Sequence, residues 1–358
     1  MNCNERLTGA SQSSDDGGGG RAASGSAGAG VLAGEERRPD DYHGTIADRV
    51  PPERIRELSR IDQTRSVLHS AGEWVLIAAA IALCERVGSI WLYPVTVAFL
   101  GGRQHALFHL AHEATHYHLF RNRKVNDVFG DVVLAWASFH SIPLYRKRHF
   151  GHHRNIGNID DPHIAETYQR SPTEWRFPKT RGALALWMLR RLTGLTFPRY
   201  MRAFVRGFTH APSRGYIAFK IAYYAAMFGA ITALGGWRIW LLYWIVPLAT
   251  WTPMIRDLRL AAEHFGIDGE EDLIGGKSRT VLPSVLGRIF VCSKGTYFHS
   301  EHHDYPSVPF YHLRRLHEEM RDNPRLLPRL HLTMGYGRVL AQLSAASSSP
   351  RAEARTGT

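Results

Sequence analysis

Two apolar segments, each split by a short break, constrain the fold of this chain more than any other feature. A helix needs about 20 mostly apolar residues to cross the hydrocarbon core of a membrane. The first segment covers residues 67–84 and 90–111, and the second covers residues 216–234 and 237–254. This pattern predicts an all-α integral membrane protein with two transmembrane helical hairpins, and therefore four spans.

A few polar residues interrupt the expected spans. Glu73 lies near the start of the first span, Arg103 and Gln104 lie within the second, and Lys220 lies within the third. A soluble all-α protein that buries both hairpins is the alternative interpretation of the same pattern. The interruptions by themselves do not decide between the two.

The hairpins also predict which parts of the chain share one side of the membrane. Because each hairpin crosses and returns, the N-terminus, residues 113–215 and everything after residue 255 lie together. Arginine and lysine are concentrated in these parts, so the positive-inside rule places them and both termini in the cytoplasm. The net charge of +12 is then assigned to a basic cytoplasmic face, and no nucleic acid is expected as a partner.

Composition divides the chain into three parts. Residues 1–45 are rich in Gly, Ala and Ser and are predicted to be a disordered tail. Residues 46–335 form the expected membrane domain, and residues 336–358 a flexible C-terminal tail. The first residues contain no apolar run of the kind found in secretory signals.

Histidine is the outlier in composition, with 20 copies, many of them bunched. His112 and His116 have the i, i+4 spacing that puts two side chains on one helical face. The spacing H-x-x-H-H, which also gathers its histidines on one face, then occurs twice, at His149, His152 and His153 and at His299, His302 and His303. All three boxes fall on the predicted cytoplasmic side, in a helical cap over the spans.

The number of histidines indicates which kind of site they form. A structural zinc takes four ligands and a catalytic zinc takes three plus water. The boxes provide eight histidines, which is more than one zinc ion uses. They fit two metal ions with higher coordination numbers, although imidazole alone does not select among zinc, copper, nickel and iron.

The order and spacing of the boxes resemble those of the membrane fatty acid desaturase family. Residues 160–162 are similar to the acidic D-P segment after that family's second box, and residues 262–266 to its extra histidine element. Residues 301–309, E-H-H-D-Y-P-S-V-P, resemble its third-box run most specifically. The resemblance implies that nine histidines bind two iron ions: His112, His116, His149, His152, His153, His264, His299, His302 and His303.

The same resemblance implies the chemistry and the partners. We expect O₂-dependent oxidation of an unactivated C–H bond in a lipid or fatty acyl chain, with desaturation ahead of hydroxylation or alkene-forming decarboxylation. Electrons are expected from a separate ferredoxin- or cytochrome b5-type protein, because the chain has no H-P-G-G haem-binding element. The particular lipid, the position oxidised and the oligomeric state stay open.

Two interpretations from other classes compete with this one. The first box is also H-E-x-x-H, the zincin motif, in which two histidines bind zinc and the glutamate acts as general base. An intramembrane metalloprotease using His112-Glu113-Ala114-Thr115-His116 leaves both H-x-x-H-H boxes unexplained. A non-enzymatic metal or haem carrier is the third possibility.

For other residues around the boxes we predict supporting roles and not metal binding. Carboxylates beside the boxes are candidates to accept the free ring N–H of a ligand histidine, with Asp161 and Glu263 favoured among Glu113, Asp160, Asp161, Glu263, Glu301 and Asp304. His105 and His109 are expected inside the helix bundle, as structural or access-channel residues. The remaining histidines outside the boxes are assigned to the surroundings of the site or the surface, and replacing His118 is expected to have no effect.

Overall fold

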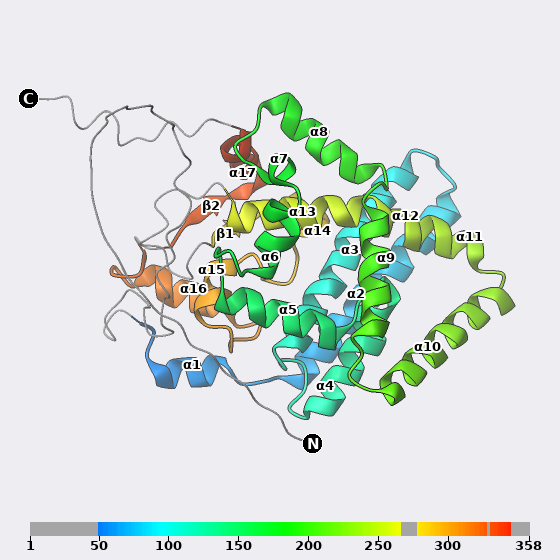
Figure 1. Ribbon diagram of the computed structural model, residues 1–358, viewed down its shortest axis with the longest axis horizontal. Coiled ribbons are helices and arrows are strands. Elements are labelled where there is room, and N and C mark those ends of the chain that lie inside the picture. Colours follow the sequence, from blue (N-terminus) through cyan, green and yellow to red (C-terminus); the bar gives the residue numbers. More distant parts are fainter. Residues whose placement is uncertain (1–48, 266–277, 328–329, 345–358) are drawn as a thin grey trace, which may run out of the picture. The chain divides into compact units, whose positions relative to one another are not determined.

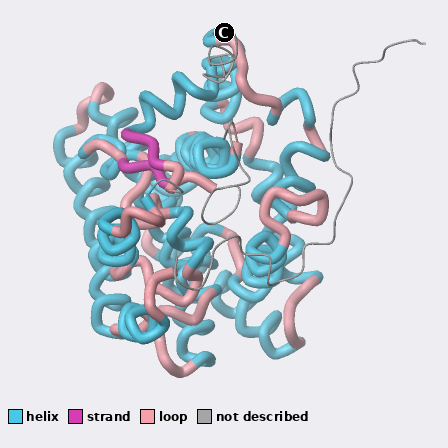
Figure 2. The backbone as a smooth tube through the Cα atoms, turned by 90° about the vertical axis from the view of Figure 1, so that its left-hand side faces the viewer, coloured by secondary structure: helices cyan, strands magenta, loops and turns pink. Residues whose placement is uncertain are grey.

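The computed structural model describes residues 49–265, 278–327 and 330–344, all of which belong to one unit, Gly44–Thr358. The predicted tail of residues 1–45 therefore lies outside the described residues. The described part is mostly helical, with one two-stranded parallel sheet (Figures 1 and 2).

The first half of the domain supplies the first hairpin and the helix of the second box. Its elements are α1 (Pro52–Leu58), α2 (Gln63–Val87), α3 (Leu92–Thr115), α4 (Arg123–Phe129), η2 (Gly130–Ala135), η3 (Trp136–Ser138) and α5 (Ile142–Arg154). Shorter helices follow: α6 (Pro162–Ile164), η4 (Ala165–Gln169), α7 (Pro172–Trp175), α8 (Arg181–Leu192) and α9 (Phe197–Thr209).

The second half contains the second hairpin and the third box. Its helices are α10 (Arg214–Ala233), α11 (Trp237–Trp240), η5 (Leu241–Ile245), α12 (Val246–Ala249), α13 (Trp251–His264), α14 (Val285–Phe290), α15 (His299–Asp304), α16 (Leu313–Asp322) and α17 (Gly335–Ser344). The strands β1 (Thr280–Leu282) and β2 (Leu332–Met334) pair in parallel, with Thr280 opposite Leu332.

Helices α2 and α3 form the first hairpin and lie side by side (Figure 1). Gly88 ends α2 in the left-handed conformation, with φ of 65°, which glycine adopts without steric cost. By length and composition α2 can cross a membrane, and only 22% of its most apolar stretch is buried. Between Val67 and Leu83 the exposed side chains of α2 are all apolar, as contact with lipid would require.

The polar residues that interrupt the first hairpin are buried and satisfy one another. Arg103 lies 3.1 Å from Glu73, and Lys294 lies 2.6 Å from the same carboxylate. Gln104 donates to the carbonyl of Trp244 at 2.8 Å and accepts from Thr252 at 2.8 Å. Because a buried charge or amide without a partner is costly, this pairing explains how the helices tolerate these residues.

Helix α3 needs small residues where it meets two other helices. A Cβ at Gly101 would lie 2.7 Å from Trp251, and one at Gly102 would lie 2.9 Å from the Ile289 carbonyl. Only glycine permits this approach of α3 to α13 and α14. The close packing fixes the depth at which the histidines at the end of α3 are held.

The second hairpin is helical throughout, although its returning half is segmented. Helix α10 is long and apolar enough to span a membrane, and 11% of its most apolar stretch is buried. The return consists of α11, η5 and α12 and breaks at Thr250 before α13 begins. Pro253 causes a break at this point, because a proline ring clashes with the carbonyl four residues earlier. Two described helices, α2 and α10, therefore qualify as candidate spans.

The last helix lies inside the segment expected to be a flexible tail. Val339 and Leu343 of α17 are fully buried and pack in a cluster with residues of α8 and α13. Buried leucine and valine at this spacing stabilise a helix against its neighbours. Helix α17 thus covers the first part of that segment, through Ser344, and the rest of the expected tail lies outside the described residues.

The small sheet positions the helix that carries the third box. Thr280 at the start of β1 donates to the Glu301 carboxylate of α15, and the amide of Val281 donates to the carbonyl of Tyr297. Since β2 comes from residues just before α17, the sheet joins the third box to the end of the domain.

Candidate metal centre

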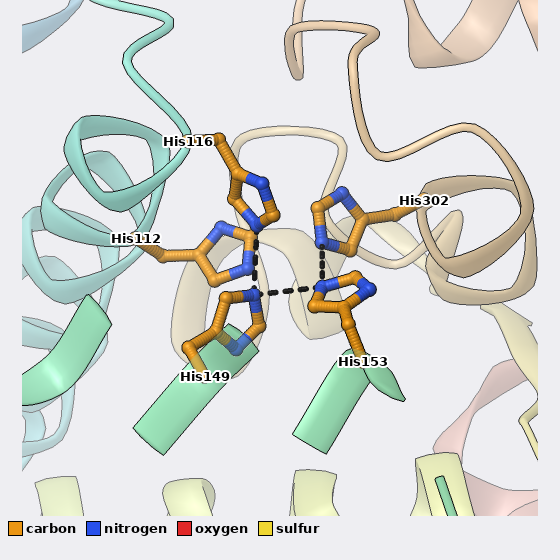
Figure 3. A group of neighbouring side chains, drawn as sticks. All are labelled: His112, His116, His149, His153 and His302. Atoms are coloured by element: carbon orange, nitrogen blue, oxygen red, sulfur yellow. Dashed lines mark hydrogen bonds between the residues drawn. The ribbon is translucent and has the colours of Figure 1, made fainter. Parts of the chain in front are cut away.

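Five histidines from three helical segments converge on one point (Figure 3). They come from the end of α3, from α5 and from α15, and they are His112, His116, His149, His153 and His302. The Nε2 atom of His149 lies 2.8 Å from that of His116 and 2.9 Å from that of His153, which lies 3.2 Å from that of His302. We call this group the five-histidine cluster.

Four further histidines form a second group beside the first. They are His152 of α5, His264 at the end of α13, and His299 and His303 of α15. The Nε2 atoms lie 2.9 Å apart in the pair His264 and His299, 3.1 Å in the pair His299 and His303, and 3.3 Å in the pair His303 and His152. We call this group the four-histidine cluster.

The H-x-x-H-H spacing explains why the clusters are adjacent. On a helix, residues four apart lie on one face and the residue between them points about 100° to the side. In α5 the outer residues His149 and His153 enter the five-histidine cluster, whereas His152 enters the other. Helix α15 is arranged the opposite way, with His302 in the five-histidine cluster. Each of the two H-x-x-H-H boxes therefore contributes to both clusters, whereas His112 and His116 both belong to the five-histidine cluster.

Asp161 orients one member of the four-histidine cluster. Both of its carboxylate oxygens lie 2.9 Å from Nδ1 of His152. Burial raises the pKa of Asp161, but the hydrogen bond from His152 and the amides of Gly157 and His163 outweigh this effect and lower it. Because an ionised carboxylate only accepts, His152 donates through Nδ1 and presents the lone pair of Nε2 to the cluster.

Glu113 connects the first box to the loop after α15. One oxygen lies 3.3 Å from Nδ1 of His112, and the other lies 3.0 Å from Nδ1 of His118 and accepts from the amide of Phe310 at 3.0 Å. His118 is thus buried behind the five-histidine cluster. The expectation that replacing His118 has no effect loses its basis, because His118 helps to hold the carboxylate that orients His112.

Glu263 lies near the four-histidine cluster, but its carboxylate pairs with an arginine. Its carboxylate pairs with Arg259 one turn earlier in α13, and its other oxygen lies 3.9 Å from Nδ1 of His299. That separation is too long for a hydrogen bond. Asp161, the other favoured carboxylate, therefore has the direct contact that Glu263 lacks.

Glu301 anchors the third box through partners that lie outside both clusters. Its side chain is fully buried, lies 2.5 Å from Nδ1 of His317, and accepts from Thr280. Sequence reasoning missed His317 because that histidine belongs to no box and lies in a separate helix, α16. The position of His317 on the apolar face of the amphipathic helix α16 could have indicated that its side chain is buried.

Several histidines near the clusters join neither of the two main groups. His105 and His109 are buried in α3, and His109 lies 3.4 Å from Arg259. His163 stacks on His152 with ring centroids 4.0 Å apart, and with His152 and Asp161 it forms a third, smaller group. His140 is partly buried against Phe108, and His312 is partly buried.

The donor set fits metal ions. Burial, and after it the neighbouring imidazoles, lower the pKa of four of these histidines well below the ordinary value: His149, His299, His302 and His303. A neutral imidazole has one N–H, so nitrogen lone pairs face one another within 4.8 Å in each cluster. Cations at the two points of convergence would satisfy them. Neutral imidazole is also the form that binds a metal.

The geometry is unlike that of a zincin site. Three further histidines converge with His112 and His116, which gives five, whereas a catalytic zinc takes three protein ligands. The Glu113 carboxylate is occupied by Nδ1 of His112, by His118 and by a backbone amide, on the side away from the converging Nε2 atoms. It is therefore not positioned as the general base of a metalloprotease.

Comparison with known proteins agrees with the two clusters and the apolar hairpins. The family model described as Fatty acid desaturase matches residues 89–336, so the chain belongs to that family. Among curated proteins, a dihydrorhizobitoxine desaturase of Bradyrhizobium elkanii is 26% identical over 298 residues, covering 80% of this chain and 84% of the relative.

A second relative comes from a plant. The endoplasmic reticulum omega-3 fatty acid desaturase of Nicotiana tabacum is 22% identical over 302 residues, covering 74% of this chain and 76% of the relative. Membership in the family supports an oxidoreductase of the desaturase type, and with the two candidate spans it supports association with a membrane.

Proposed function

We propose that this chain is a membrane-bound di-iron enzyme that uses O₂ and electrons to desaturate a lipid or fatty acyl chain. The observation that carries the proposal is the pair of adjacent histidine clusters, five and four residues in size, whose members are the nine histidines implied by the family resemblance. Two clusters that share α5 and α15 would hold two metal ions close together.

Iron, when bound, would supply the O₂ chemistry that removes hydrogen from an unactivated C–H bond, which no ordinary side chain can do. The protein residues then have two tasks. The nine imidazoles hold the metals, and Asp161 and Glu113 orient His152 and His112 through their Nδ1 atoms. Hydroxylation and alkene-forming decarboxylation are alternative outcomes at the same centre.

The proposed substrate is a lipid or fatty acyl group. The apolar outer faces of α2 and α10 support access from a membrane. The names of the relatives allow a wider range of substrates, since one is an omega-3 fatty acid desaturase and the other a dihydrorhizobitoxine desaturase. Product analysis has to include polar metabolites as well as lipids for this reason.

The proposed topology has four spans with the clusters and both termini in the cytoplasm. The second crossing would be α3 and the fourth the segmented run α11, η5 and α12, next to the two candidate spans α2 and α10. Reporter domains fused at Met1 and at Thr358 should give the same cytoplasmic signal. Signals from opposite sides would contradict the two-hairpin topology.

Metal analysis and oxygen uptake test the function together. Purified protein should contain about two iron ions per chain and consume O₂ when a reductant and lipid are supplied. Mass spectrometry of cells with and without the gene should show a product two hydrogens lighter than its precursor. Bound zinc with no O₂ consumption would contradict the proposal, and a product heavier by one oxygen would indicate hydroxylation.

A further inference from the structure

An open pocket of about 650 Å³ reaches the edge of the five-histidine cluster. Two of its lining residues, His116 and His153, are members of that cluster. The rest of the lining comes from the connection between α1 and α2, from residues 117–123, from α5 and from the chain after α15. At this pocket, two side chains that are proposed to bind metal are accessible from the surface of the protein.

The rim of this pocket is strongly basic. Arg121, Arg123 and Arg154 line it, all three are exposed, and its lining contains no aspartate or glutamate. Among the described residues none of the three forms an ion pair, whereas two other arginines of α5 pair with carboxylates of α4 and η4. The rim therefore carries three positive charges that no described carboxylate of the chain neutralises.

Tyr117 fixes part of this rim. It adopts φ of 62°, a conformation that is uncommon for a residue with a side chain. Its ring lies 4.9 Å from the guanidinium of Arg123 and 3.9 Å from that of Arg146. Cation–π contacts of this kind hold an arginine in place while its charge stays available to a partner.

We propose that this pocket is the docking site for an acidic one-electron carrier protein. The inference rests on the proposed function, which consumes two electrons per turnover that have to come from a separate donor. An acidic surface is complementary to three unpaired arginines. Once docked, the carrier would have its redox group close to the rings of His116 and His153, which lead directly to the metal centre.

The electron balance fixes how often the carrier must dock. Desaturation removes two hydrogens from the substrate, and O₂ takes up these two hydrogens, two protons and two electrons to give two water molecules. The carrier is oxidised by one electron in each encounter, so it docks twice per turnover. A site that is open and held together by charge allows the rapid exchange that this requires.

The openness of the pocket argues against the acyl chain as the occupant. A small-molecule site buries most of the surface of its ligand, whereas this pocket is open to solvent and bordered by Arg121, Arg123 and Arg154. A docked protein covers an open basic surface of this kind, so the partner that fits it is soluble and anionic.

Charge reversal at the rim tests the proposal. The double variant Arg121→Glu and Arg123→Glu changes the rim without touching a cluster histidine. Its matched control is Arg202→Glu and Arg206→Glu, two exposed arginines of α9 outside the pocket. Each protein is placed in discs of uncharged phosphatidylcholine, and binding of two probes is measured at low and high salt: an acidic [2Fe–2S] ferredoxin and the soluble domain of cytochrome b5.

We expect the rim variant to bind at least one probe about tenfold more weakly than the wild type at low salt. The control should stay within about twofold, and the difference should shrink at high salt. Equal binding by rim variant and wild type would overturn the proposal, as would failure of the wild type to bind either probe. Loss of binding to anionic vesicles alone would assign the rim to the membrane instead.

Binding and function fail in distinguishable ways. Iron content and O₂ uptake driven by dithionite are measured on the same samples, and the rim variant should match the wild type in both. A wild type that binds a probe but contains no iron would contradict the proposed function and leave the docking site standing. A rim variant that loses iron would show that these arginines support the metal centre, which overturns their assignment to docking alone.

Discussion

The two histidine clusters differ in how the chain builds them. All members of the five-histidine cluster belong to boxes with helical spacing, and the cluster borders an open pocket. The four-histidine cluster includes His264, which belongs to no box, and its member His152 is held by the buried carboxylate of Asp161. One cluster is thus defined by local spacing, and the other depends on a helix that arrives from the second hairpin.

This difference shows what positions a ligand that lies outside a motif. His264 is the last residue of α13, and α13 packs on α3 through Trp251 and Gly101. The contact between the hairpins therefore sets where His264 meets His299, at 2.9 Å between Nε2 atoms. Periodicity within one helix contains no information about such a contact.

Replacing His264 should have the largest effect and tests the comparison most directly. His264→Ala should abolish turnover and lower bound iron from about two to about one ion per chain, because the four-histidine cluster loses a quarter of its nitrogens. His302→Ala should do the same through the other cluster. Metal analysis and oxygen uptake of purified variants measure both effects.

The control for these variants is His210→Ala. His210 is exposed at the end of α9 and contacts only its own helix, whereas the buried His118 is unsuitable. If His264→Ala keeps full iron and full activity, His264 is structural and another group completes the four-histidine cluster.

Replacing Asp161 should have the second-largest effect, because Asp161 orients a proposed metal ligand and is not itself a ligand. Asp161→Ala removes the acceptor for Nδ1 of His152 and also the N-cap of α6. Iron affinity should fall roughly 10- to 100-fold, as for other carboxylates that hold a ligand histidine. Competition with a chelator measures this, and Asp160→Ala, which changes an exposed neighbour, should bind iron as the wild type does. Equal affinities for the two variants would show that Asp161 does not orient His152.

Replacing Glu263 should have a smaller effect on iron affinity and a clear effect on the stability of the fold. Glu263→Gln leaves the buried Arg259 without its carboxylate partner, and breaking such a pair costs roughly 3–5 kcal/mol. Because Glu263 lies 3.9 Å from His299, iron affinity should change by less than the Asp161 variant shows. Thermal unfolding and chelator competition separate the two effects. A loss of iron as large as that of Asp161→Ala would mean that Glu263 orients His299 directly.

The grouping of side chains within each box could be predicted from the sequence, because the members of a box lie within about one helical turn of each other. The sequence also located the breaks at Gly88 and Gly235, both of which adopt positive φ. It did not predict that Glu73 and Arg103 pair across the first hairpin, or that Glu113 contacts Phe310. These contacts join residues that are far apart in the chain, whereas the spacing of residues in a motif predicts only contacts within the same helix.

Removing residues 1–40 should have the smallest effect, and the comparison of clusters explains why. Both clusters consist of residues from His112 onward, and residues 1–40 contain no histidine. Their Gly-, Ala- and Ser-rich composition provides few apolar side chains for packing. Iron content and turnover of the truncated protein should therefore stay within about twofold of the full chain. A truncated protein that inserts into the membrane and binds two irons but is inactive would show that this segment acts on a step after metal binding, such as the supply of substrate or electrons. If the truncated protein instead loses one of its two iron ions, one cluster depends on the N-terminal segment and the other does not.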